Sequence, residues 1–168
     1  VSSRAGRWYI SVQVEQEVTI GSHPSTSEIG IDAGITCFAA FSDGTMVEGV
    51  HSFRKHQERL AREQRKLAHK KKGSNNWKKQ KQRVSRLHHH ICNARSDFLH
   101  KLSTQISENQ ARVYVEKLQV KNMSASAGGT IEEPGRGVRA KSGLNRSILD
   151  QGWYTFRRQL DYKLAWKG

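Results

Sequence analysis

The sequence is poor in cysteine and has no long apolar run, and each shortage excludes a class of protein. Two cysteines, Cys37 and Cys92, occur without any paired C-x-x-C motif, which argues against a disulfide framework and against a zinc knuckle. No apolar run approaches the roughly 18 residues of a membrane span, and the N-terminus does not resemble a signal peptide. We therefore expect an intracellular soluble protein with no membrane partner.

Acidic residues are also scarce, with 15 Asp and Glu against 29 Lys and Arg and a net charge of +14. The segment from Arg54 to Lys101 holds 16 basic and 3 acidic residues, so it carries +13 and leaves +1 for the remainder. A charge confined to one segment is typical of nucleic-acid binding, although an anionic membrane would also attract it. We expect contacts mainly to phosphates, and therefore salt-dependent binding.

The length of 168 residues, 35% of them hydrophobic, suffices for one compact domain. Apolar and polar residues alternate from Trp8 to Val14, which predicts a half-buried strand and the end of a preceding β domain over residues 1–22. The stretch 21–27, rich in Ser, Gly and Pro, is then a linker. Because the chain starts at Val1 and stops directly behind a helical pattern, we expect a fragment of a longer protein.

The next stretch, Ile29-Gly-Ile-Asp-Ala-Gly-Ile-Thr36, begins a predicted β-meander. Strands are expected at about 28–32, 36–42 and 45–50, with a hairpin turn at Asp43-Gly44. Asp32 ends the first strand, and Gly34 removes the Cβ that would keep a ligand from the backbone. Asp32 is therefore either the cap of a turn or a ligand for a hard metal ion or phosphate.

Helical spacing of apolar residues replaces the strand pattern after Phe53 and continues, with one interruption, to Ile106. Gly73 predicts a helix stop, and Ser74 or Asn75 an N-cap, so we expect a basic antiparallel helical hairpin over about 53–109. Trp77 is either a base-stacking residue or an anchor between the helices. The three consecutive histidines from His88 point about 100° apart and cannot converge on one ion. The predicted nucleic-acid-binding residues are Arg59, Arg62, Arg65, Lys66, Lys70, Lys71, Lys72, Trp77, Lys78, Lys79, Arg83 and Arg86.

Strand character returns at 112–118, and Glu116 lies at the far end of that strand, as Asp32 does in the first. Two such carboxylates could hold a divalent metal against a phosphodiester, whereas the alternative is that Glu116 only faces solvent. The glycine-rich stretch at about 124–143 predicts a long mobile loop. An apolar face from about 145 to 166 predicts one helix, with Asp150 and Asp161 on its surface.

Five segments, in this order, resemble the TnpB (OrfB) proteins of bacterial insertion sequences. They are Gly30-Ile-Asp-Ala-Gly34 with Ser42-Asp-Gly44, the basic helices around 64–73, Asp97-Phe-Leu-His-Lys-Leu-Ser103, Val115-Glu-Lys-Leu118 with Asn122-Met123, and Leu144 to Trp153 with Phe156-Arg157. The resemblance implies an α/β, RNase H-like (RuvC-type) mixed sheet, present in part over residues 23–168. It also implies an RNA-guided DNA endonuclease, commonly named a transposase and related to the type V CRISPR nucleases.

The resemblance assigns Asp32 as the first catalytic aspartate and Glu116 as the catalytic glutamate, with Mg²⁺ or Mn²⁺ as cofactor. It implies guide RNA and DNA as partners and the bacterial cytoplasm as location. The third catalytic aspartate and a four-cysteine zinc ribbon follow the segment matching Leu144 to Gly168, so zinc is expected only beyond this chain. Neither Asp150 nor Asp161 matches the missing aspartate, and we therefore expect an incomplete active site.

Two other functions fit parts of the sequence. A noncatalytic or truncated nucleic-acid-binding protein would use the basic hairpin and keep the carboxylates as relics. An ATPase of the actin and Hsp70 type is suggested because Gly30 to Thr36 also resembles the first phosphate loop of that fold. The stretch Ser126 to Thr130, which could complete that site, lacks an acidic residue before its glycines.

Overall fold

The computed structural model describes residues 1–17 and 19–168 and divides the chain into two compact units. The hairpin unit contains residues 1–19 and 52–96, and the sheet unit contains residues 20–51 and 97–168. The expected domain boundary near residue 22 stays a prediction. No helix among the described residues combines the length and apolar character needed to cross a membrane.

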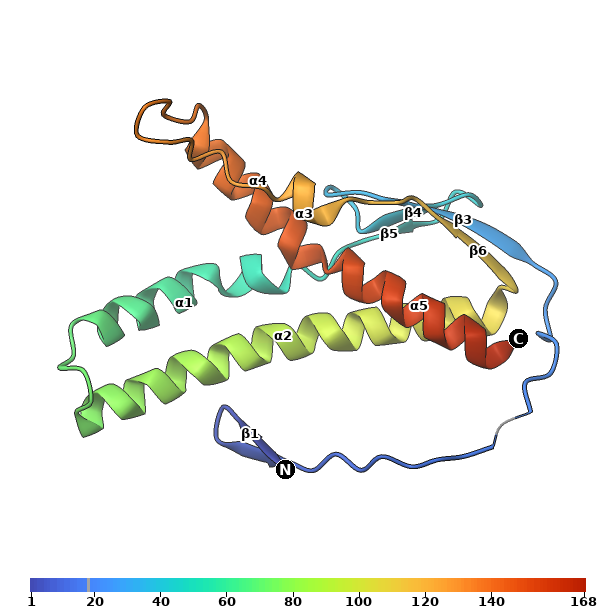
Figure 1. Cartoon of the computed structure of the whole chain (residues 1–168), viewed down its shortest axis with the longest axis horizontal. Coiled ribbons are helices and arrows are strands. Elements are labelled where there is room, and N and C mark those ends of the chain that lie inside the picture. Colours follow the sequence, from blue (N-terminus) through green and yellow to red (C-terminus); the bar gives the residue numbers. More distant parts are fainter. Residues whose placement is uncertain (18) are drawn as a thin grey trace. The chain divides into compact units, whose positions relative to one another are not determined.

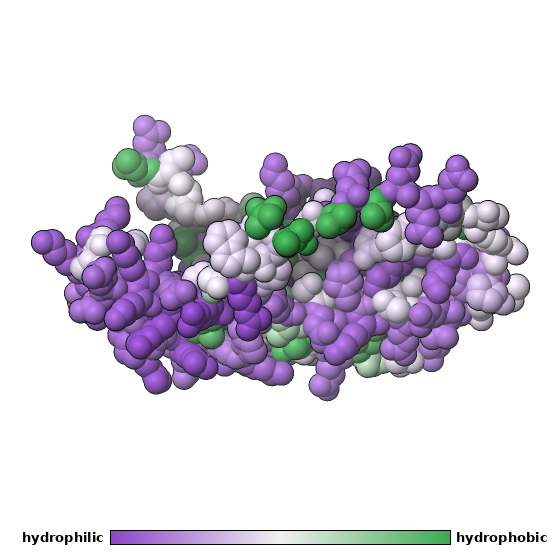
Figure 2. Space-filling model, turned by 90° about the horizontal axis from the view of Figure 1, so that it is seen from below, coloured by the Kyte–Doolittle hydropathy of each residue, from purple (hydrophilic) through white to green (hydrophobic). Residues whose placement is uncertain are grey.

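The hairpin unit is built on helix α1 (Ser52–Ala68) and the first part of α2 (Asn75–Asn109), which run antiparallel beside each other (Figure 1). Gly73 adopts a φ of +85°, and the Ser74 hydroxyl accepts a hydrogen bond of 3.2 Å from the Trp77 backbone N–H. The predicted stop and N-cap are thus present, with Ser74 as the cap. Leu60, on α1, packs with three α2 residues in a small core; these are Val84, Leu87 and Ile91. The surface around the hairpin turn is mainly hydrophilic (Figure 2, left).

Two short antiparallel strands, β1 (Ser2–Arg4) and β2 (Arg7–Tyr9), also belong to the hairpin unit. The strand predicted from Trp8 to Val14 is wrong beyond Tyr9, because residues 10–14 have no regular structure. Ile10, Val12 and Val14 remain about three-quarters exposed. Alternating residues form a half-buried strand only where another element covers their apolar side, and here that side stays exposed.

The sheet unit contains a mixed four-stranded sheet in the order β5-β4-β3-β6. β3 (Glu28–Ala33) pairs antiparallel with β4 (Ala39–Phe41) and parallel with β6 (Arg112–Val115). β5 (Met46–Val47) pairs antiparallel with β4. β4, β5 and β6 are shorter than predicted. The expected α/β class with a mixed sheet is confirmed.

Helices pack against one face of this sheet. Ile29 and Ile31 of β3 are buried, whereas Glu28 and Asp32, which alternate with them, are exposed on the opposite face. The Phe38 ring makes edge contacts with Phe98 and Phe156, at centroid distances of 5.1 and 5.0 Å. The remaining core residues come from β4, the end of α2 and the C-terminal helices; they are Ala39, Leu99, Leu102, Ile106, Ile148, Trp153 and Leu160.

Three helices follow β6, namely α3 (Val120–Met123), α4 (Val138–Gln151) and α5 (Trp153–Lys167). The prediction of one helix over 145–166 is wrong, because Gly152 has a φ of +78° and separates α4 from α5. The irregular stretch after α3 ends at residue 137 instead of 143, and its mobility stays a prediction. Asp161 is exposed as expected, but Asp150 is buried.

Candidate functional site

The two predicted catalytic carboxylates lie at the same end of neighbouring parallel strands. The β3–β6 register pairs Gly30 with Tyr114 and Ile31 with Val115, and the next positions along the two strands are Asp32 and Glu116. Both are exposed. Because side chains alternate along a strand, Asp32 points away from the core that buries Ile31. Asp32, at the end of β3, and Glu116, directly after β6, therefore follow the last register pair of the two strands at the same edge of the sheet.

The turn after Asp32 closes tightly. Asp32 itself lies within β3, with Ala40 as its register partner on β4, and the turn begins after Ala33. The Gly34 N–H donates to the Phe38 carbonyl at 3.3 Å, and a Cβ on Gly34 would lie 3.1 Å from the Cys37 carbonyl oxygen. Glycine at position 34 thus keeps β3 and β4 close at the end that carries Asp32.

An ion pair that the sequence analysis missed joins the other ends of the same two strands. Arg112 Nη1 lies 2.6 Å from Glu28 Oε1, and the Tyr114 hydroxyl donates to Glu28 Oε2 at 3.0 Å. The hydrogen bond from Arg112, and then that from Tyr114, lowers the pKa of Glu28 below its ordinary value. This pair supports the register that sets Asp32 beside Glu116. Glu28 and Arg112 are 84 residues apart, so no local sequence pattern predicts this ion pair.

The donor set at the strand ends fits part of a magnesium site. Carboxylate oxygens are the ligands that Mg²⁺ and Mn²⁺ prefer, and Asp32 and Glu116 supply two such groups. No group of three His, Cys, Asp or Glu residues that could hold a metal occurs within residues 1–17 and 19–168. The two carboxylates are thus compatible in chemistry with two ligands of such a site.

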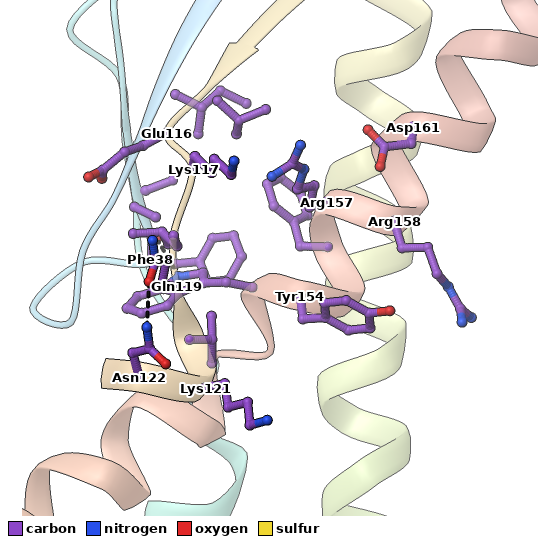
Figure 3. A pocket seen from close by; sticks show the side chains of 18 residues that line it. Phe38, Glu116, Lys117, Gln119, Lys121, Asn122, Tyr154, Arg157, Arg158 and Asp161 are labelled. Atoms are coloured by element: carbon purple, nitrogen blue, oxygen red, sulfur yellow. Dashed lines mark hydrogen bonds between the residues drawn. The ribbon is translucent and has the colours of Figure 1, made fainter. Parts of the chain in front are cut away.

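A cavity of about 610 Å³ lies on the core side of the sheet, between the β6–α3 segment and α5 (Figure 3). Its apolar lining includes Ile31 and Phe38, which belong to the core face. Glu116 is at its rim, but Figure 3 shows the Glu116 carboxylate directed away from the cavity. Asp161 also lines it. The carboxylate pair therefore faces away from this cavity, and Asp161 lies on the opposite side of the sheet from Asp32.

The predicted nucleic-acid-binding residues lie on the surface of the hairpin unit. All are exposed except Lys70 and Trp77, which are partly buried. The Lys81 ammonium lies 5.1 Å from the Trp77 ring centroid, so this indole already contacts a cation. The structure leaves both interpretations of Trp77 open, base stacking and packing between the helices.

One acidic residue inside the basic hairpin has a structural role. Glu63 accepts hydrogen bonds from Lys66 at 2.9 Å and from the buried Gln80 amide at 2.7 Å. These bonds, that from Lys66 first, lower the pKa of Glu63. Gln80 also donates to the Glu63 carbonyl at 3.1 Å, so it links α2 to α1. This link was not predicted, although the spacing of Gln80, Val84 and Leu87 places a polar residue on the apolar stripe.

Comparisons with known proteins identify the family of the chain. The profile of the OrfB_IS605 family, described as "Probable transposase", matches residues 11–127. The chain is 58% identical over its full length to "Putative RNA-guided DNA endonuclease InsQ" of Escherichia coli strain K12. It is 38% identical, over 98% of its length, to "Putative RNA-guided DNA endonuclease" of Streptomyces pristinaespiralis. The chain spans only 42% and 37% of the lengths of these two relatives.

Proposed function

Because this chain belongs to the OrfB_IS605 family of probable transposases, we propose that it forms part of an RNA-guided DNA endonuclease with an RNase H-like (RuvC-type) sheet. The observation that carries this proposal is the parallel β3–β6 register, which sets Asp32 next to Glu116 on an exposed face. The names of the two relatives, which describe RNA-guided DNA endonucleases, support the same proposal.

The chemistry we propose is hydrolysis of a DNA phosphodiester. Asp32 and Glu116 would hold Mg²⁺ or Mn²⁺, which when bound supplies Lewis-acid activation of water and of the phosphate. The exposed position of both carboxylates leaves room for a DNA strand against the sheet. As the resemblance to TnpB proteins implies, we propose that a third carboxylate and a zinc ribbon are supplied outside these 168 residues.

The basic hairpin supplies the binding part of this proposal. Its exposed Arg and Lys side chains would contact phosphates of guide RNA and DNA, which gives affinity with little sequence preference. Location in the bacterial cytoplasm follows from the same function. The main alternative is a noncatalytic nucleic-acid-binding protein that uses the hairpin alone.

A chimera provides the test. This chain replaces its matching segment in the Escherichia coli relative, and cleavage of target DNA is measured with guide RNA and Mg²⁺ or Mn²⁺. We expect the chimera to cut, and Asp32→Asn or Glu116→Gln to slow cutting by about a thousandfold. A loss of that size corresponds to the several kcal/mol of charge stabilisation that a bound metal provides.

Asp43→Asn serves as the matched control, because Asp43 is an exposed carboxylate of the same unit whose Oδ1 accepts the Thr45 backbone N–H at 2.8 Å. That variant should cut at the unsubstituted rate. Unchanged cutting by Asp32→Asn would refute the catalytic assignment. A chimera that binds nucleic acid and never cuts, while the relative does cut, would favour the binding protein.

A further inference from the structure

A polar cavity in the hairpin unit is not explained by the catalytic proposal. It has a volume of about 470 Å³ and lies between the turn of β1–β2 and helix α2. We call it the turn cavity; its lining residues are Ala5, Gly6, Arg7, Arg86, His89, His90 and Asn93. Its volume is within the range of roughly 300–1,000 Å³ that small-molecule sites occupy.

The turn itself is shaped to approach α2 closely. Ala5 and Gly6 both have positive φ, +52° and +81°, as a two-residue hairpin turn of this type requires. A Cβ on Gly6 would lie 2.6 Å from the Gln82 side-chain nitrogen of α2. The turn therefore lies against the Gln82 side chain, and Arg7, the residue after Gly6, lines the turn cavity together with Arg86 of α2.

The floor of the turn cavity is fixed by hydrogen bonds on both sides of one imidazole. The Asn93 amide nitrogen lies 3.0 Å from His89 Nδ1, and the Tyr9 hydroxyl lies 3.0 Å from His89 Nε2. With Asn93 donating to Nδ1, the neutral ring carries its proton on Nε2 and donates it to Tyr9. The Tyr9 and His89 rings are also stacked, with centroids 6.1 Å apart. His89 is thus held in one orientation.

The charges around the turn cavity have one sign. Arg7 and Arg86 line it, and no acidic side chain does so among the residues that the structure describes. A second polar cavity, next along α2, shares Arg86 and His90 with it and adds Arg59, Arg83 and one carboxylate, Glu63. That carboxylate already accepts hydrogen bonds from Lys66 and Gln80. Arg83, Arg86 and His90 follow helical spacing and lie on one stripe of α2. Basic side chains therefore outnumber acidic ones along the two cavities, and the turn cavity itself is lined by Arg7 and Arg86.

We propose that the turn cavity binds a backbone phosphate of the nucleic acid, held between Arg7 and Arg86 against the fixed His89 ring. Arginine suits this role because its guanidinium donates two parallel hydrogen bonds to phosphate oxygens. This inference rests on the proposed nucleic-acid binding of the hairpin and extends it to the N-terminal strands. Guide RNA and DNA share the phosphodiester, so both are tested.

The test compares two arginines that are register partners in the same β-hairpin, Arg4 and Arg7. Only Arg7 lines the turn cavity. Affinities of the whole chain for labelled RNA and DNA of one sequence are measured between 50 and 200 mM salt. Arg7→Gln should weaken binding about five- to tenfold and reduce the slope of log K against log[salt] by about 0.7–0.9. Arg4→Gln should leave the slope unchanged.

Further variants separate the outcomes. Arg7→Lys retains the charge and should restore the slope, and circular dichroism verifies that each variant is folded. A loss confined to the RNA probe assigns the phosphate to RNA, and a loss confined to the DNA probe assigns it to DNA. Equal effects of Arg4→Gln and Arg7→Gln, or none, would overturn the inference. Failure of the unsubstituted chain to bind either probe would instead overturn the proposed interface.

Discussion

Glu28 shows how one side chain supports the site without belonging to it. Its carboxylate joins Arg112 and Tyr114 of β6 to β3, at the strand ends opposite Asp32 and Glu116. Since β3 and β6 share only four register pairs, each additional link between them restricts sliding. The geometry of the candidate metal ligands therefore depends partly on a residue that cannot contact the metal itself.

The stability contributed by Glu28 should depend on pH. The pKa of Glu28 is lowered in the folded chain below the ordinary 4.5, so on acidification the unfolded chain binds the proton first. The contribution is complete above about pH 4.5 and is lost as the pH falls through the lowered value. Glu28→Gln should therefore reduce the melting temperature at pH 7, and the difference should shrink at pH 3.

Thermal unfolding at both pH values, followed by circular dichroism, measures this difference. Glu48→Gln, which removes another exposed carboxylate of the same unit, is the control and should show no comparable dependence. A difference between Glu28→Gln and the parent that is the same at pH 7 and pH 3 would show that the ion pair contributes nothing in solution.

At the scale of elements, the break between α4 and α5 depends on one backbone angle. Gly152, at φ +78°, ends α4, and its carbonyl accepts the Phe156 N–H at 3.0 Å in the first turn of α5. Trp153, the next residue, is buried, and its indole N–H donates to the Phe38 carbonyl at 3.3 Å. The change of direction at Gly152 thus places Trp153 and α5 against the sheet.

Two glycine substitutions should have opposite effects on stability. Gly152→Ala forces a side chain into the left-handed region and should lower the free energy of unfolding by about 1–2 kcal/mol. Gly143→Ala, inside α4 and with open space around the new Cβ, should raise it by up to about 1 kcal/mol. Urea denaturation measures both. A change of the free energy of unfolding in the same direction for both variants would contradict the role given to Gly152.

Elements were predictable where the signal is local. Gly73 and Ser74 marked the ends of α1 and α2 because helix stops and caps are properties of a few adjacent residues. Gly152 was missed since an isolated glycine also occurs inside helices, and only the tertiary contacts of Trp153 decide between the two. The strand predicted beyond Tyr9 is absent because alternation of apolar and polar residues predicts a face that could be buried. It does not show whether another element covers that face.

For the whole molecule, the location of the charge is more informative than its sum. Replacing Lys70, Lys71 and Lys72 by Gln removes three charges from the hairpin turn. Replacing Arg136, Arg139 and Lys167 removes the same number elsewhere. If the hairpin is the interface, the first variant should reduce the slope of log K against log[salt] by about 2–3, and the second by less than about one.

Fluorescence anisotropy with single-stranded DNA between 50 and 200 mM salt measures these slopes. Because both triple variants have the same net charge, a difference between them reports on position alone. Equal slopes would mean that the protein attracts nucleic acid through its overall field and has no defined interface on the hairpin.

The positions of Asp32 and Glu116 in the candidate site were predictable because both residues lie at the ends of expected strands. Asp32 and Glu116 each ended an expected strand, and the carboxyl ends of parallel neighbours meet at one edge of a sheet. The link between Glu63 and Gln80, and the turn cavity between Arg7 and Arg86, were not predicted. The turn cavity joins residues distant in the sequence, for which a single chain offers no periodic signal. Gln80, in contrast, stands on the apolar stripe of α2, so its spacing marked it as a buried polar residue but did not identify Glu63 as its partner.

The parallel pairing of β3 with β6 also determines when the site can form. Glu28 and Arg112 are 84 residues apart, and the whole basic hairpin is synthesised between them. At about 5–20 residues per second, a ribosome takes several seconds to make that stretch. The helices, whose contacts are local, fold within microseconds to milliseconds. On the nascent chain, the surface proposed to bind nucleic acid should therefore mature before the carboxylates meet, so that binding precedes any capacity to cut.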